Sequence, residues 1–241
     1  MQLTKLSIII PVYNEAATVG LILDKIKAVQ LIHHIEKEFV IINDNSQDDS
    51  KKIILKFIEE NPLLAIVYHE HLQNKGKGAS IHTGISIAKG EYLIIQDADL
   101  EYDPQEYNLL LKPVLEDVAD VVYGSRFMDK QAKRSSYFWH YNANKFLTFL
   151  SNLCSGLKLT DMETCYKLVN TQLIQSIQLT EKRFGFEPEI TAKMSRIKDI
   201  RVQEVGISYQ SRPYDEGKKI GWKDGVRAIY CILKYGLFRM N

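Results

Sequence analysis

The sequence predicts an α/β fold with a mainly parallel, doubly wound sheet and helices on both faces. Up to Ser125, five short runs of apolar, often β-branched residues alternate with segments of helical periodicity, and no segment repeats at a fixed period. Strands that alternate with helices in this way form parallel sheets covered on both sides. With 241 residues, the chain is long enough to bury a substantial core.

The five expected strands end in polar segments. The strands lie at residues 6–12, 39–44, 64–70, 91–97 and 119–125. The segments at their ends read PVYNE, NDNSQDD, HEHLQNKGKG, QDADLE and YGSRF. Ligands bind to sheets of this kind at the carboxyl ends of the strands, so the polar segments predict a binding site.

Helical spacing is found between these strands. Apolar residues from Val19 to Val29 recur with the helical period and predict a first helix. Residues 48–61 predict a second helix with two aspartates in its first turn. Residues 77–90 predict a third helix that ends near Gly90.

The regular alternation fades after Phe127. Residues 132–156 are basic and aromatic and predict a helix, whereas residues 159–169 predict a polar loop that enters an apolar run. A turn and a helix are expected over residues 181–197, and a strand over residues 200–210.

The chain has no linker rich in Gly, Ser or Pro, so residues 1–211 are expected to form one continuous domain. From residue 212 the sequence is basic and then aromatic and apolar, and residues 212–241 are expected to form a basic, amphipathic appendage. Basic residues and large apolar residues are interleaved in it. A helix of this kind lies on an anionic bilayer or covers the core of its own domain. The aromatic segment SYFWHYNANKFLTFL leaves the same two alternatives.

Composition narrows the class of protein. The net charge of +1 gives no general case for nucleic-acid binding. Three cysteines without a CxxC pair indicate a reduced, cytoplasmic protein. The apolar run near the N-terminus is about half of the ~18 residues that a membrane span needs, and we expect neither a signal peptide nor a span. Any contact with a membrane is therefore expected at the surface.

The row DADLE follows the fourth strand and places Asp97, Asp99 and Glu101 at alternate positions. In an extended segment these side chains point the same way and can ligate one hard cation, whose charge would offset their repulsion. The alternative is a solvated acidic turn. Asp103 is expected to cap the following helix, with Pro104 in the first helical position.

The first two strand ends suggest nucleotide contacts. Glu15 in PVYNE and Asp44 in NDNSQDD would face one crevice and can bind a base or a ribose. The alternative for PVYNE is local: Asn14 caps the next helix and Glu15 interacts favourably with its dipole.

Positive charge comes first from NKGKG, where glycines next to Lys75 and Lys77 would let the backbone approach a ligand closely. The segment lacks the Gly-Lys-Ser/Thr of a phosphate loop. Arg126 and Arg134 are further candidates for phosphate contacts. Solvation is the alternative for any single cation, and we favour it for Lys75.

The segments SIIIPVYNE, VIINDNSQDDS, NKGKGASIHTGISIAKGEYLIIQDADLEYDP and VVYGSRF, in this order, resemble the nucleotide-sugar-binding half of family-2 glycosyltransferases with the GT-A fold. The closer likeness is to the polyprenyl- and dolichyl-phosphate mannosyl- and glucosyltransferases. It covers about the first 130 residues, and DMETCYKL and RFGFEPEI extend it to about residue 190.

The resemblance implies roles for the residues in these motifs. The nucleoside would be held by Pro11, Tyr13, Glu15 and Asp44. Asp97 would lie near the ribose or the metal, and Mg²⁺ or Mn²⁺ on the diphosphate would be ligated by Asp99 and Glu101. Phosphates of the donor or the acceptor would be faced by Lys77, Arg126 and Arg134. Asn43 departs from the second Asp of many relatives, which leaves the base preference open.

Catalytic candidates on the acceptor side are Asp161, Lys167 and Glu187. Their structural alternatives are that Asp161 caps a turn and that Glu187 begins a helix before Pro188. A sugar hydroxyl needs a carboxylate to take its proton, whereas a lipid phosphate is already an anion and needs cations to position it. Direct displacement inverts the anomeric carbon, as the resemblance also implies.

We therefore expect a metal-dependent, inverting glycosyltransferase that moves a hexose from a UDP- or GDP-sugar to a polyprenyl phosphate, peripherally bound at the cytoplasmic face of the membrane. One alternative is transfer to a glycan hydroxyl. Another is a sugar nucleotidyltransferase, although PVYNEAATVG lacks its glycine-rich signature. A nucleotide-sensing module without catalysis is the third. The sugar, the base, the lipid length and the oligomeric state stay open.

Overall fold

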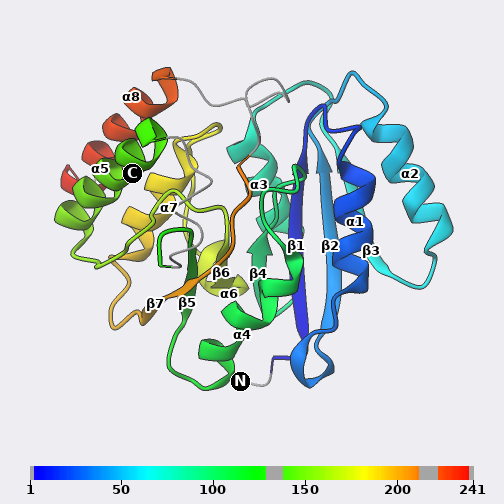
Figure 1. Cartoon of the computed structure of the whole chain (residues 1–241), viewed down its shortest axis with the longest axis horizontal. Helices are drawn as coiled ribbons and strands as arrows, with labels where there is room; N and C mark the ends of the chain where they lie inside the picture. Colours follow the sequence, from blue (N-terminus) through cyan, green and yellow to red (C-terminus); the bar gives the residue numbers. More distant parts are fainter. Residues whose placement is uncertain (1–2, 129–137, 212–221, 239–241) are drawn as a thin grey trace.

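A single seven-stranded sheet forms the centre of the computed structural model (Figure 1), which describes residues 3–128, 138–211 and 222–238. The strand order is β3-β2-β1-β4-β6-β5-β7. The strands are β1 (Lys5–Val12), β2 (Glu36–Asn43), β3 (Ala65–Glu70), β4 (Tyr92–Ile95), β5 (Val121–Ser125), β6 (Lys167–Asn170) and β7 (Val202–Gly206).

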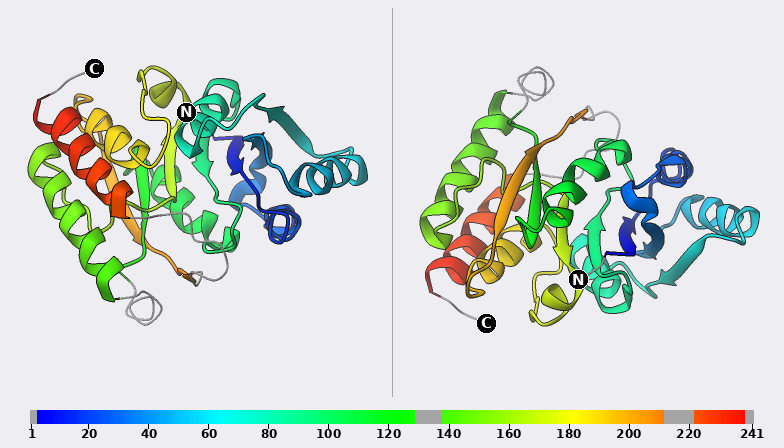
Figure 2. Two further views of the ribbon diagram at one scale, coloured as in Figure 1. Left: turned by 90° about the horizontal axis from the view of Figure 1, so that it is seen from above. Right: turned by 90° about the horizontal axis from the view of Figure 1, so that it is seen from below.

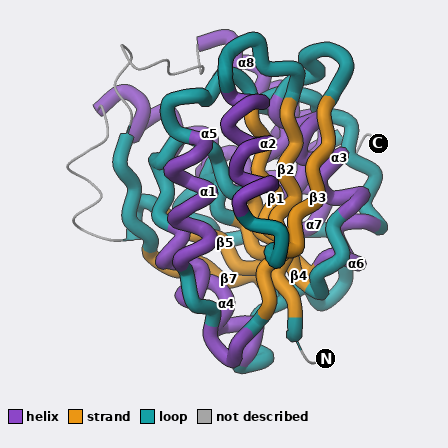
Figure 3. Tube along the Cα trace, turned by 90° about the vertical axis from the view of Figure 1, so that its right-hand side faces the viewer, coloured by secondary structure: helices purple, strands orange, loops and turns teal. Residues whose placement is uncertain are grey.

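Helices cover both faces of this sheet, as the sequence predicts. Figure 3 shows α1 and α2 on one side of the strands and α3 and α7 on the other. The α-helices are α1 (Val19–Ala28), α2 (Ser50–Glu60), α3 (Lys77–Ile87), α4 (Tyr107–Leu115), α5 (Phe138–Ser155), α6 (Thr171–Gln175), α7 (Phe186–Met194) and α8 (Trp222–Cys231). Shorter helical turns are η1 (Ile32–His34), η2 (Pro104–Glu106) and the π-helical η5 (Ile232–Leu237).

The pairing of the strands is mainly parallel. β1 pairs in parallel with β2 and β4, β2 with β3, and β5 with β7. β6 is the exception, because it runs antiparallel between β4 and β5. All five strands expected up to Ser125 are present, and so is the later one at β7. β6 was expected only as an apolar run, since four residues are too few to show a period.

Of the two predictions made for the starts of helices, one is confirmed and the other is wrong. Asp103 caps η2 as predicted, since its Oδ1 accepts a hydrogen bond of 3.1 Å from the backbone N–H of Gln105, and Pro104 takes the first position. The expectation of aspartates in the first turn of α2 is wrong, because that helix begins at Ser50. Asp48 instead precedes it and accepts a hydrogen bond from the Ser50 N–H.

The C-terminal segment packs against the rest of the chain. Figure 2 shows α8 and η5 alongside α5. Cys231 and Tyr235 are fully buried, and the Tyr235 hydroxyl donates a hydrogen bond of 2.9 Å to Glu181. The domain boundary at residue 212 stays a prediction, because residues 212–221 lie outside the described part of the chain.

A close backbone contact joins the start of α3 to residues 181–183. A Cβ on Gly78 would lie 2.3 Å from the carbonyl oxygen of Glu181, and one on Gly76, whose φ is +97°, would lie 2.5 Å from that of Lys182. The backbone N–H of Ala79 donates a 3.0 Å hydrogen bond to the same Lys182 oxygen. The space beside these glycines is therefore filled by the chain's own backbone. The close approach of this segment to a ligand stays a prediction.

Substitution of Gly78 by Ala is expected to lower the free energy of unfolding by about 1–3 kcal/mol, because its Cβ would overlap backbone that cannot rotate away. Chemical denaturation measures this change. Gly225→Ala is the matched control: Gly225 lies within α8 with open space beside it, so its replacement should be neutral or stabilising by up to ~1 kcal/mol. Equal stability of the two variants would contradict the contact.

Candidate active site

A pocket opens at the carboxyl ends of β1, β2 and β4, where the sequence predicts a binding site. Its volume of about 310 Å³ lies at the lower end of the range of small-molecule sites. Eight residues predicted from the sequence line this pocket. They are Pro11, Tyr13, Glu15, Asp44, Lys77, Asp97, Asp99 and Glu101.

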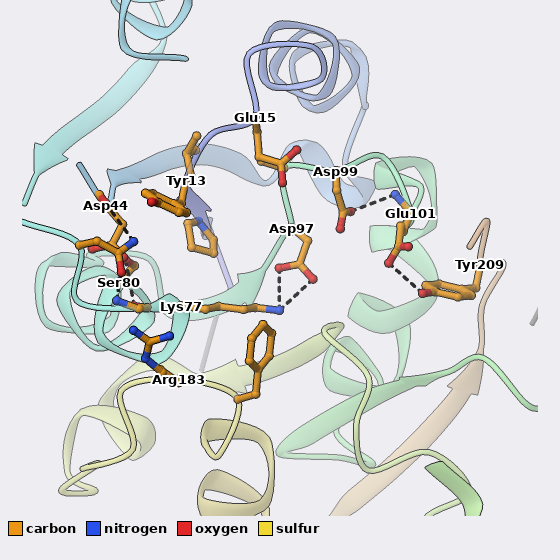
Figure 4. A pocket seen from close by; sticks show the side chains of 16 residues that line it. Tyr13, Glu15, Asp44, Lys77, Ser80, Asp97, Asp99, Glu101, Arg183 and Tyr209 are labelled. Carbon is orange, nitrogen blue, oxygen red and sulfur yellow. Dashed lines mark hydrogen bonds and ion pairs between the residues drawn. The ribbon is translucent and has the colours of Figure 1, made fainter. Parts of the chain in front are cut away.

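The pocket has two chemically different ends and a charged centre (Figure 4). Tyr13 and Asp44 lie at one end, and Glu101 lies at the other. The carboxylate of Asp44 is 2% exposed and accepts a 2.7 Å hydrogen bond from the backbone N–H of Gly76. An aromatic ring beside a buried acceptor suits a flat heterocycle better than a phosphate.

Lys77 forms the charged centre. Its Nζ lies 2.8 and 2.9 Å from the two carboxylate oxygens of Asp97 and 3.7 Å from Glu187. Burial alone would lower the pKa of Lys77, but the neighbouring negative charges, that of Asp97 first, raise it well above its ordinary value. This side chain therefore stays a cation in the middle of the pocket at any physiological pH.

The acidic row lies next to this cation. Burial, and then the charges of Asp97 and Glu101, raise the pKa of Asp99 from 3.8 to about 7. Glu101 accepts a 2.8 Å hydrogen bond from the hydroxyl of Tyr209. Within the described ranges, no three His, Cys, Asp or Glu side chains are gathered closely enough to hold a metal ion. The metal-binding role of these acids stays a prediction.

The donor set nevertheless fits a hard divalent cation. Mg²⁺ is usually bound by one or two carboxylates together with the phosphates of its substrate, so a complete protein cage is not needed. Asp97 and Asp99 supply such carboxylates on the pocket wall. Burial first, and then the charges of Asp97 and Glu101, raise the pKa of Asp99, and a bound cation would favour its ionised form.

Arg126 and Asp161 pair with each other outside the pocket lining. The guanidinium makes two hydrogen bonds of 2.7 and 2.8 Å to the Asp161 carboxylate, which also accepts the backbone N–H of Arg126 at 3.0 Å. Asp161 is fully buried. In this conformation the carboxylate binds an arginine rather than capping a turn, and the phosphate role of Arg126 stays a prediction. Arg134 lies outside the described residues.

Lys167 lies in the interior at the start of β6. It is fully buried, and its ammonium donates to the backbone carbonyls of Met162 (3.0 Å) and Thr164. Burial lowers its pKa. These contacts hold the loop before β6 and do not bring Lys167 to the pocket wall. Glu187 stands in the first turn of α7, before Pro188, as its structural alternative predicts.

One buried carboxylate near these residues was not predicted from the sequence. Burial, and then the charge of Glu187, raise the pKa of Glu163 to about 8. Its Oε1 is buried and has no hydrogen-bond partner in the described part of the chain.

Other pocket residues were also missed. Asn74, Ser80, Arg183, Phe184 and Tyr209 line the pocket but were not predicted to do so. Arg183 and Phe184 stand in RFGFEPEI, a segment from which only Glu187 was chosen. Tyr209 follows β7, more than a hundred residues after Glu101, so that no local spacing connects the two.

Asn14 and Asn43, which belong to the predicted nucleotide motifs, make hydrogen bonds within the fold. Asn14 does not cap α1, which begins at Val19; its Oδ1 accepts the backbone N–H of Gln47. Asn43 is fully buried, accepts the N–H of Ser46 and donates to the Tyr68 hydroxyl.

Comparison with known families gives one match over most of the chain. The model of Glycosyl transferase family 2 matches residues 7–177. The undecaprenyl-phosphate 4-deoxy-4-formamido-L-arabinose transferase of Photorhabdus laumondii is 26% identical over 219 residues, which are 90% of this chain and 63% of that protein. The dolichyl-phosphate beta-glucosyltransferase of Dictyostelium discoideum is 28% identical over 221 residues, which are 85% of this chain and 66% of that protein. The chain thus spans about two thirds of the length of these relatives.

Solved structures confirm the predicted GT-A fold. Glucosyl-3-phosphoglycerate synthase from Mycobacterium tuberculosis, in complex with Mn²⁺, UDP and glucosyl-3-phosphoglycerate, is 16% identical with a TM-score of 0.70, over 97% of this chain and 80% of that one. Mannosyl-3-phosphoglycerate synthase from Rubrobacter xylanophilus is 20% identical with a TM-score of 0.71, over 98% of this chain and 74% of that one.

The crowding of the acidic row predicts that Asp99→Asn raises the melting temperature of the metal-free protein at pH 8. We expect a rise of about 2–4 °C, which corresponds to ~1 kcal/mol in a chain of this size. The folded-state pKa of Asp99, about 7, exceeds its ordinary value of 3.8. Ionisation therefore destabilises the folded state increasingly as the pH rises from about 4 to 7. The gain should be small at pH 4 and full at pH 8.

Thermal melts at several pH values measure this effect. Asp103→Asn is the matched control, because Asp103 stands in the same row but caps η2, a position that Asn fills equally well. Added Mn²⁺ should stabilise the wild type more than Asp99→Asn. A lower melting temperature of Asp99→Asn at pH 8 would show that Asp99 is not under repulsion.

Proposed function

Because the chain belongs to glycosyl transferase family 2, we propose that this glycosyltransferase moves a hexose from a UDP- or GDP-sugar to a polyprenyl phosphate with inversion of the anomeric carbon. The observation that carries the proposal is the order of chemistry along the pocket. A ring and a buried acceptor at one end, a cation in the centre and carboxylates beyond it match a nucleoside, a diphosphate and a metal in turn.

This order supports one orientation of the donor. The nucleoside would be held by Pro11, Tyr13, Glu15 and Asp44, with its diphosphate near Lys77. The synthase from Mycobacterium tuberculosis, which shares the fold, was solved with UDP and Mn²⁺. Lys77 suits the leaving diphosphate, because a fixed cation stabilises the negative charge that develops there without reorganising at the moment of reaction.

A divalent cation, Mg²⁺ or Mn²⁺, would be held by Asp97, Asp99 and Glu101. When bound, it would neutralise charge on the leaving diphosphate. The chain's own contribution is to position these groups: Tyr209 orients Glu101 through its hydroxyl, and the backbone N–H of Glu101 donates to Asp99 at 3.1 Å.

A phosphate acceptor is supported by the names of the relatives, which act on undecaprenyl phosphate and dolichyl phosphate. Such a nucleophile brings its own negative charge and needs no general base. Asp161, Lys167 and Glu187 do not line the pocket in this conformation. Glu187 instead lies near Lys77, where it can orient that cation. Arg126, held by Asp161, and Arg134 are the proposed contacts to the acceptor phosphate.

Transfer of radiolabelled hexose to undecaprenyl phosphate tests the proposal. With Mn²⁺ and a UDP- or GDP-hexose, label should enter the organic phase. Lys77→Ala should slow this transfer about 100-fold or more, which is typical for the loss of a group that stabilises developing charge. Lys75→Ala is the matched control, because that exposed side chain does not line the pocket.

Other products would support the alternatives. Label found only in water-soluble glycan would indicate a hydroxyl acceptor. Release of pyrophosphate from a nucleoside triphosphate and a sugar phosphate would indicate a nucleotidyltransferase, and nucleotide binding without any turnover would indicate a sensing module.

We further propose that the protein binds peripherally to the cytoplasmic face of the membrane through an apolar surface on α5 and the C-terminal segment. Large side chains that are at least half exposed occur on both: Phe146, Phe149, Leu153, Val226, Tyr230, Leu237 and Phe238. The two elements lie side by side (Figure 2). Exposed apolar patches on soluble proteins often mark sites of interaction with proteins or membranes.

An anionic bilayer is the proposed occupant of this surface, because the acceptor is a membrane lipid and basic side chains stand among the apolar ones. Arg227 is half exposed on α8, and Lys234 lies on η5. Among the helices that the structure describes, none is long and apolar enough to cross a membrane.

Vesicle flotation tests this surface. Phe149→Ser should weaken binding to phosphatidylglycerol vesicles about tenfold, since burial of a Phe side chain is worth ~1.5–3 kcal/mol. Leu63→Ser is the matched control, because Leu63 is 98% exposed in the turn between α2 and β3, far along the chain from this surface. Wild-type protein that stays unbound, or two variants that behave alike, would contradict the proposal.

A further inference from the structure

The carboxylate of Asp44 is held by three N–H donors of the described chain. Its Oδ1 accepts hydrogen bonds from the ring Nδ1 of His71 at 2.6 Å and from the backbone N–H of Lys75 at 2.9 Å. Its Oδ2 receives the backbone N–H of Gly76 at 2.7 Å. Asp44 and His71 are each 2% exposed. The direction in which this carboxylate points is therefore fixed before any ligand binds.

The ring of His71 is held between two oxygens. Its Nδ1 faces a carboxylate that already accepts two backbone N–H groups, so Nδ1 is the donor of the hydrogen bond to Asp44. Its Nε2 lies 3.0 Å from the hydroxyl oxygen of Thr83, which also lies 3.1 Å from the backbone carbonyl oxygen of Ala79. His69, whose ring centre lies 5.5 Å away, is the other titratable ring beside it.

These contacts determine how many hydrogen-bond acceptor sites of the Asp44 carboxylate are left for a ligand. A carboxylate offers about two acceptor sites on each oxygen. His71 and the Lys75 N–H fill both sites on Oδ1, and the Gly76 N–H fills one on Oδ2. One acceptor site is left, on Oδ2, in a side chain that lines the pocket.

We propose that His71 determines base specificity: by filling Oδ1 of Asp44, it leaves a single acceptor for the base of the donor nucleotide and thereby selects uracil over guanine. This inference rests on the proposed function, in which Asp44 holds the nucleoside. Uracil presents one ring N–H between two carbonyls, which suits a single acceptor. Guanine presents two neighbouring N–H donors, N1 and N2, which pair with both oxygens of a carboxylate. Here the second oxygen is taken, so one guanine donor would stay unpaired.

The surroundings suit the carbonyls of uracil. Arg183 lines the same end of the pocket as Asp44 and Tyr13 (Figure 4) and carries only donors. A ring to stack on, one acceptor and a nearby donor group complement the edge of uracil. Cytosine presents an acceptor at the ring position where uracil has its N–H, so it would meet the Asp44 carboxylate with repulsion.

Calorimetric binding of UDP and of GDP to the full chain in Mn²⁺ tests the inference. Wild type should bind UDP about tenfold or more tightly than GDP, because a donor buried without a partner costs about 1–3 kcal/mol. His71→Phe frees one site on Oδ1, so the preference for UDP should fall towards parity. General damage to the fold would weaken both nucleotides and leave their ratio unchanged.

Two further variants separate specificity from stability. His71→Gln keeps one N–H that can donate to Asp44 and should retain the preference for UDP. Thr83→Val disturbs the same buried network but leaves Nδ1 as a donor, so it should also retain the preference. Should His71→Phe not fold, the ratio in wild type and in His71→Gln still decides, together with an NMR spectrum that shows a proton on Nδ1 of His71.

Each outcome has a distinct meaning. Binding of GDP as tightly as UDP by wild type overturns the inference and leaves a nucleotide site in place. Preference for UDP that is unchanged in folded His71→Phe overturns the role of His71. Binding of neither nucleotide overturns the proposed function and this inference with it.

Discussion

The site depends on a contact that only glycine allows, between Gly76 and Gly78 and the backbone of residues 181–183. A side chain at either position would force the start of α3 away from that segment. Because they meet, Arg183 and Phe184 reach a pocket whose other lining residues, apart from Tyr209, lie between Pro11 and Glu101. Lys77, between the two glycines, points to Asp97, while the N–H of Gly76 reaches Asp44. Three consecutive residues thus connect one end and the centre of the pocket with a later part of the chain.

Electrostatics then decide what the pocket can hold. Lys77 stays positive among carboxylates, and Asp99 resists ionisation because burial and its neighbours oppose it. Ionisation of Asp99 therefore makes the free protein less stable than a neutral side chain at this position would. A ligand that brings both a cation and a diphosphate relieves the repulsion among the acids and uses the charge of Lys77. The acids that repel one another in the empty pocket, together with Lys77, therefore favour a metal-bound nucleotide sugar.

The sequence predicts the fold and one wall of the site because both are local. Strand periods and polar strand ends locate β1 to β5, and the eight predicted residues at these ends do line the pocket. Contacts across the chain could not be predicted in this way. Arg126 pairs with Asp161, and Tyr209 approaches Glu101 from beyond β7. β6 was missed as a strand because its pairing partners, rather than its four residues, define it.

The central claim is that the pocket holds a nucleoside diphosphate with its base at Asp44 and its phosphates at Lys77. A crystal structure of the protein soaked with UDP and Mn²⁺ tests it most directly. We expect the base beside Tyr13 and Asp44, the diphosphate near Lys77, and the metal ion between the diphosphate and the acids that include Asp97 and Asp99. Density for the nucleotide in the reverse orientation, with phosphates at Asp44, or at another surface of the protein would contradict the claim.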